Sequence, residues 1–109
     1  MSNSTGNTLY VRTVLTIPGA GQAIHIAQLR EQGSDTCHLE KMIALAPDES
    51  IVGAATPTAT HGNIDKPSAV VPHPALYDQF PDITAEYIEE KHFTALWAEA
   101  QGLLSGLSD

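Results

Sequence analysis

The feature that most constrains the fold is an apolar stripe near the end of the chain. Apolar residues recur there at intervals of three and four: Phe93, Leu96, Trp97, Ala100, Leu103, Leu104 and Leu107. This spacing places them on one side of an α-helix. Such a helix has to bury its apolar side against a second layer of structure. The rest of the chain must therefore supply an apolar surface for the helix to cover.

The preceding segments supply that surface as β-strands. Residues 9–17 alternate between two faces and are rich in β-branched side chains, which is typical of a strand. The sequence Pro-Gly-Ala-Gly at 18–21 ends this strand, because proline cannot donate to a sheet and glycine accepts positive φ. Turn residues at 47–50 separate two further predicted strands, over 36–46 and 51–54.

Residues 22–32 fit two structures, and the choice decides the fold class. As a helix after the Gly19-x-Gly21 turn, they would open a dinucleotide-binding βαβ unit. Ile24 then stands where that motif has its third glycine, and the apolar residues do not form one helical stripe. As a strand, the segment carries apolar side chains on both faces, as the centre of a sheet does. The strand interpretation gives four antiparallel strands.

The sequence thus predicts an α+β fold, an antiparallel sheet of about four strands packed against a C-terminal helix. Phe93, Leu96 and Trp97 are expected to form the contact, and Trp97 to be mostly buried. We expect a single domain over residues 9–109, which follows a disordered lead-in over residues 1–8.

Composition excludes several classes of protein. Cys37 is the only cysteine, which excludes a disulfide framework and a zinc site of several thiolates, and which suits a reducing compartment. We expect a cytoplasmic protein, because no apolar run approaches the roughly 20 residues of a membrane span and the first residues lack signal-peptide features. A net charge of −8 repels nucleic acid and membrane lipid and favours a basic partner.

No catalytic motif is found in the sequence. It contains neither Gly-x-Ser-x-Gly nor the phosphate-binding Gly-x-x-x-x-Gly-Lys-Ser/Thr. The five histidines, at positions 25, 38, 61, 73 and 92, are at least 12 residues apart, unlike metal ligands on one helix or strand. We therefore expect no enzyme activity, no cofactor and no metal site. His61 and His73 lie in a predicted long loop over residues 55–74, and we expect them to face a partner.

The charge pattern of the last third is strongly acidic. Between residues 78 and 99, six acids outweigh the single base Lys91, which gives a net charge of −5. This pattern predicts a negative surface complementary to a basic protein. The predicted partner-binding residues are Asp82, Glu86, Glu89, Glu90, His61 and His73.

Three stretches of the chain resemble a small bacterial family of uncharacterised domains. They are Leu9-Tyr10-Val11-Arg12, Leu39-Glu40-Lys41-Met42 and Ile88-x-x-x-x-Phe93-x-x-Leu96-Trp97. Some members lie beside polymorphic toxin genes and are regarded as immunity proteins. The resemblance implies a non-enzymatic protein that covers the active site of a cognate toxin enzyme, and it favours the strand interpretation of residues 22–32. The matched residues look like core and turn positions, so the resemblance assigns no functional residue.

Two other functions stay open at this point. A small nucleotide- or metal-dependent enzyme would use the Gly19-x-Gly21 turn or the histidines. An inhibitor of a host nuclease, encoded by a phage or mobile element, would use the same acidic surface against a different target.

Overall fold

The computed structural model describes residues 7–19, 21–33, 35–64 and 66–104, which form one antiparallel sheet, a 3₁₀ helix and one α-helix. The strands are β1 (Thr8–Ile17), β2 (Gly21–Glu31), β3 (Thr36–Leu45), β4 (Ile51–Thr56), β5 (Ala59–Gly62), β6 (Val70–Pro72) and β7 (Ile83–Tyr87). The 3₁₀ helix η1 (Pro74–Gln79) precedes β7, and α1 (Glu90–Leu103) follows it. The predicted α+β class is confirmed, but the described residues contain seven strands, not four.

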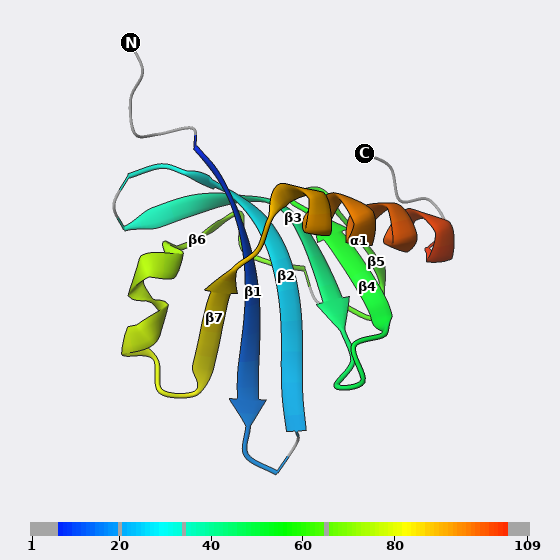
Figure 1. Cartoon of the computed structure of the whole chain (residues 1–109), viewed down its shortest axis with the longest axis horizontal. Coiled ribbons are helices and arrows are strands. Elements are labelled where there is room, and N and C mark those ends of the chain that lie inside the picture. Colours follow the sequence, from blue (N-terminus) through cyan, green and yellow to red (C-terminus); the bar gives the residue numbers. More distant parts are fainter. Residues whose placement is uncertain (1–6, 20, 34, 65, 105–109) are drawn as a thin grey trace.

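The sheet is an antiparallel meander in the order β5-β4-β3-β2-β1-β7, with β6 paired to the start of β3. Residues 22–32 belong to the long central strand β2, so the strand interpretation is correct and the βαβ alternative is wrong. Figure 1 shows α1 crossing one face of the sheet, while η1 lies beside β7. We call the face under α1 the helix face and the opposite face the open face.

The helix face holds the larger part of the core. Phe93 and Trp97 of α1 pack over Ile26 and Ile43 of the central strands. Trp97 is 4% exposed, as predicted, and its ring stacks on that of Phe93 at 6.0 Å between centroids. The helix ends at Leu103, which is exposed, so the apolar stripe is shorter than predicted. Leu107 lies outside the described residues.

A second apolar cluster lies on the open face. It contains Val11, Ala27, Leu29, Cys37 and Leu39, with Val71 of β6 packed against it. The Cys37 side chain has no exposed surface, and this burial raises the pKa of its thiol. β6 and η1 therefore cover only one end of the open face.

Two boundary predictions are corrected by the structure. Residues 55–74 were predicted to form one long loop, but they complete β4 and contribute β5 and β6. The predicted lead-in over residues 1–8 overlaps the sheet, because β1 begins at Thr8 and the Asn7 carbonyl accepts a hydrogen bond from the Glu31 amide at 2.8 Å. Residues 1–6 lie outside the described residues. None of the described helices has the length and apolar character required to cross a membrane.

Candidate functional site

The four predicted acids are spread along β7, an edge strand of the sheet, and the start of α1. Asp82 precedes β7, Glu86 lies on it, Glu89 caps α1 and Glu90 is the first residue of α1. All four side chains are exposed. Because β7 is the last strand of the meander, these acids border a free sheet edge.

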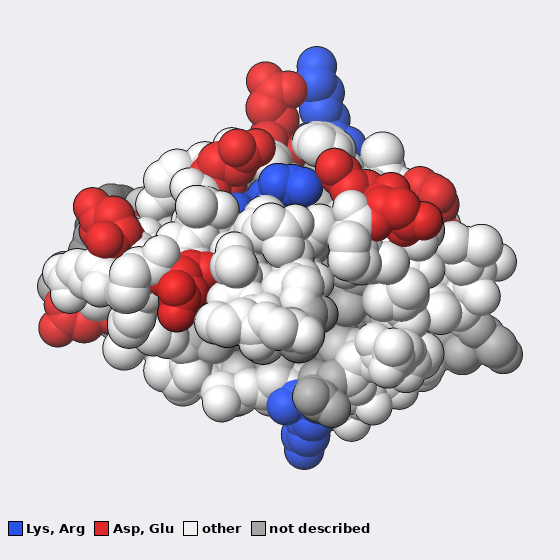
Figure 2. Space-filling view, turned by 90° about the horizontal axis from the view of Figure 1, so that it is seen from below, with Lys and Arg blue, Asp and Glu red and all other residues white. Residues whose placement is uncertain are grey.

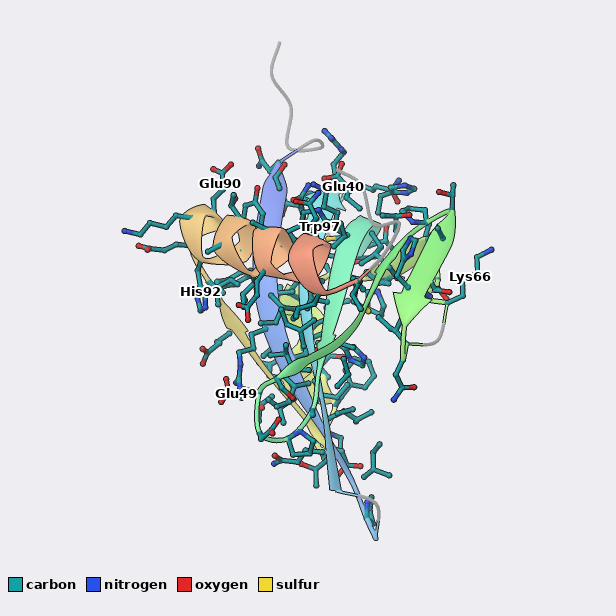
Figure 3. The ribbon with its side chains drawn as sticks, turned by 90° about the vertical axis from the view of Figure 1, so that its right-hand side faces the viewer. Glu40, Glu49, Lys66, Glu90, His92 and Trp97 are labelled. Carbon is teal, nitrogen blue, oxygen red and sulfur yellow. The ribbon has the colours of Figure 1, made fainter. Side chains whose placement is uncertain are left out.

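The β3–β4 turn adds a fifth acid that the sequence did not reveal. Glu49 adopts a left-handed backbone conformation, with φ of 72°, and its amide donates to the Ala46 carbonyl. Its carboxylate contacts the Arg12 guanidinium at 3.4 Å. Arg12, on β1, is the cross-strand partner of Glu86, on β7. Figure 3 shows Glu49 and Glu90 on the side of the molecule that carries α1. The sequence predicted a turn here, but not that it reaches the strand with Arg12.

A groove lies between η1 and β7, and none of these five acids belongs to its lining. It has a volume of about 540 Å³, and its walls include Tyr77, Phe80 and Tyr87. Phe80 and Tyr87 are large side chains that are 42% and 58% exposed. Figure 2 views the molecule from the end with the β1–β2 turn and shows acidic side chains in the upper and left parts of the view, beside a broad uncharged surface. We call this hollow the β7 groove; Asp78 also belongs to its lining.

The two predicted histidines do not join the acids. His61 lies on β5, at the opposite end of the strand order from β7. His73 is only 7% exposed, so the expectation that it faces a partner is corrected. Its Nδ1 accepts from the Ala75 amide at 3.0 Å, which leaves Nε2–H to donate to Glu31 Oε2 at 2.6 Å. His73 therefore caps η1 and fastens it to β2.

The contact between His73 and Glu31 predicts a loss of stability in acid. Hydrogen bonds from His73 and Asn7 lower the pKa of Glu31 below its ordinary value of 4.5. The folded state then binds this proton less readily than the unfolded state, so the stabilisation is complete above pH 4.5 and is lost as pH falls through the lowered pKa. Urea unfolding at neutral and acidic pH should show a smaller acid-induced loss for Glu31→Gln than for the wild type. An equal loss in both proteins would contradict this assignment, and Glu99→Gln, at an exposed position on α1, is the control.

The residues that carry the family resemblance lie on both faces of the sheet: Val11, Leu39 and Met42 belong to the open-face cluster, whereas Phe93 and Trp97 belong to the core under α1. The Lys41 ammonium stands 5.0 Å from the centroid of the Trp97 ring. Glu40 accepts hydrogen bonds from Gln28 at 2.7 Å and from Arg30 at 2.8 Å. Burial raises the pKa of the Glu40 carboxyl, but these two hydrogen bonds together with the charges of Arg30 and His38 lower the pKa overall. Lys41 therefore supports the packing of α1, whereas Glu40 joins β3 to β2.

Among the described residues, no three His, Cys, Asp or Glu side chains are grouped so that they could hold a metal ion. Comparison of the chain with protein-family models, with curated proteins and with solved structures found no match. The family resemblance and the function that it implies therefore stay predictions.

Proposed function

We propose that this is a non-enzymatic binding protein that uses the β7 edge to hold a basic protein partner. The partner is proposed to be a toxin enzyme whose active site is covered, as the family resemblance implies. The observation that carries the proposal is the pair of exposed aromatic side chains, Phe80 and Tyr87, at the β7 groove, next to an edge strand that carries or adjoins the four exposed acids. Protein interfaces commonly combine aromatic anchors with a polar rim in this way.

In this proposal the acids affect the association rate, and the aromatic residues affect the dissociation rate. Asp82, Glu86, Glu89 and Glu90 are exposed and would attract a basic surface over a distance, which raises the association rate. Phe80 and Tyr87 would be buried on binding and would slow dissociation. The unpaired side of β7 adds backbone groups that a partner strand can bond.

The aromatic residues provide the test of the proposed function. The first partner to examine is the product of the neighbouring reading frame, because an immunity gene lies beside its toxin gene. Tyr87→Ala is expected to weaken the complex about 30-fold, mainly through faster dissociation, because a buried aromatic anchor contributes about 2 kcal/mol or more. Surface plasmon resonance of the purified pair measures both rates.

A matched control exists at the other end of α1. Leu103 is 60% exposed and lies away from the β7 groove, so Leu103→Ala should leave both rates unchanged. Co-expression should also relieve the toxicity of the partner, and Tyr87→Ala should reduce that relief. The proposal is wrong if the neighbouring product does not bind, or if Leu103→Ala weakens the complex as much as Tyr87→Ala does.

A further inference from the structure

Two adjoining hollows lie on the open face, away from the acids. The first has a volume of about 390 Å³ and the second about 260 Å³, and His25 of β2 lines both. Ala23, Met42 and Ala44 line the first hollow from β2 and β3. The second extends past His25 to Phe80. Together they form a continuous apolar depression across the middle of the sheet, which we call the open-face hollow.

The first hollow owes its shape to small residues, two alanines in β2 and β3 and a glycine in β4. Ala23 and Ala44 leave space above the sheet, because their side chains stop at Cβ. The segment after β5 lies close to β4, and a Cβ on Gly53 would stand 2.9 Å from the Asn63 carbonyl carbon. Gly53 thus allows Asn63 and Ile64 to form one wall of the hollow. The close packing of this segment against β4 therefore holds the wall in place.

Three side chains of the first hollow can donate hydrogen bonds. The His25 ring is half-buried, and this burial lowers its pKa, so at neutral pH it is an uncharged imidazole with one N–H. Asn63 and Lys66, which are both exposed, also line the first hollow. Within the described part of the chain, none of these three side chains has a hydrogen-bond partner, and no carboxylate lines either hollow.

The charge on Lys66 points to an anion. Four of the five basic side chains have a contact: Arg12 with Glu49, Arg30 with Glu40, Lys91 with Glu89, and Lys41 with the Trp97 ring. Lys66 has no such contact among the described residues, in a chain of net charge −8; Asp65, which precedes it, lies outside them. Figure 3 shows Lys66 on the opposite side of the molecule from Glu49 and Glu90.

We propose that the open-face hollow binds a small organic anion with an apolar body. Lys66 and Asn63 would hold the anionic group, while the apolar body would lie over Met42 and Ala44 and reach past His25 into the second hollow. The first hollow, at about 390 Å³, is in the range of small-molecule sites, and the second, at about 260 Å³, extends it. A largely apolar lining with a few polar groups is also typical of such sites. This site is on the face opposite α1, and its second hollow shares Tyr77, Phe80 and Ile83 with the β7 groove, whereas the anionic group would lie in the first hollow, which shares no lining residue with that groove.

Two fluorescent probes that differ by one charge test the proposal. The probes are 8-anilinonaphthalene-1-sulfonate and its uncharged analogue N-phenyl-1-naphthylamine. The wild type is expected to bind the sulfonate about fivefold more tightly, which corresponds to the ~1 kcal/mol of a partly exposed ion pair. Lys66→Gln should remove this preference and leave the affinity for the neutral probe unchanged. Lys91→Gln, which changes an exposed lysine on α1, should change neither affinity.

The position of the probe is tested separately. Ala23→Phe fills the first hollow and should reduce the affinity for both probes at least tenfold. In the wild type, the sulfonate should shift the NMR signals of the His25 ring and leave those of His92, on the exposed surface of α1, in place. Equal affinities for the two probes, an unchanged preference in Lys66→Gln, or an unshifted His25 signal would each overturn the proposal. If Ala23→Phe does not fold, the His25 shift decides the position.

Discussion

Replacing Trp97 with alanine is expected to lower the free energy of unfolding by about 3–5 kcal/mol. The indole is 4% exposed and stacks on Phe93, which in turn meets Tyr10 of β1 at 5.4 Å between ring centroids. Alanine would leave a cavity between α1 and the sheet at the centre of this contact. A domain of this size has only about 5–15 kcal/mol of stability, so the variant should be close to unfolding. Urea denaturation followed by circular dichroism measures the change.

Two variants show whether the loss comes from packing. The Trp97 indole N–H is buried and has no hydrogen-bond partner among the described residues, so Trp97→Phe removes an unpaired donor while keeping most of the ring. We expect Trp97→Phe to cost less than about 1.5 kcal/mol. Leu103→Ala, at an exposed position of the same helix, should cost almost nothing. A loss below about 1 kcal/mol for Trp97→Ala would contradict the core assignment.

The strongly periodic elements could be predicted from sequence alone. The 3.6-residue period of α1 and the alternation in β1 are local signals, and each required only that one face be apolar. The segment 22–32 was ambiguous because a central strand is apolar on both faces and so lacks a clear alternation. Its pairing with both β1 and β3 resolved the choice. That pairing is a tertiary property that no local window contains.

The short strands were missed for the same physical reason. β6 has three residues and ends in proline, so its own sequence favours a loop, and only its pairing with β3 makes it a strand. β7 directly precedes the helix, and the sequence predicted no strand there; it pairs with β1 from Leu15 to Val11. Short edge strands depend on a neighbour to supply most of their hydrogen bonds.

The residues of the candidate site likewise comprise some that local sequence predicts and others that depend on tertiary contacts. The acids from Asp82 to Glu90 are near one another in sequence, so their grouping could be predicted from local charge. Glu49 joins them only through the return of the β3–β4 turn toward Arg12. The burial of His73 depends on Glu31, which is 42 residues away, and no local pattern distinguishes it from a surface histidine. Residues brought together by the sheet were therefore the ones that sequence analysis missed.

Neutralising the acids of the β7 edge is expected to slow association with the basic partner about tenfold or more at low ionic strength. The variant combines Asp82→Asn, Glu86→Gln, Glu89→Gln and Glu90→Gln. Amides are chosen over lysines because Glu86 lies across from Arg12, and because the Glu90 side chain is hydrogen-bonded to the Tyr10 hydroxyl. Lysine would place a like charge beside Arg12, whereas the amides preserve side-chain size, so the fold should survive.

The salt dependence separates steering from a change in the contact itself. Stopped-flow association should show a rate for the wild type that falls as salt is added, because exposed charges separated by more than about 8 Å are largely screened at physiological ionic strength. The neutralised variant should be slow at low salt and nearly independent of salt, and its dissociation rate should stay close to that of the wild type. Glu99→Gln, on the same helix, removes one exposed charge outside the acidic edge and should have little effect. If the association rate of the fourfold variant is unchanged, the interface does not lie at the β7 edge. The negative charge of these four exposed side chains is the only property that connects them to a basic partner.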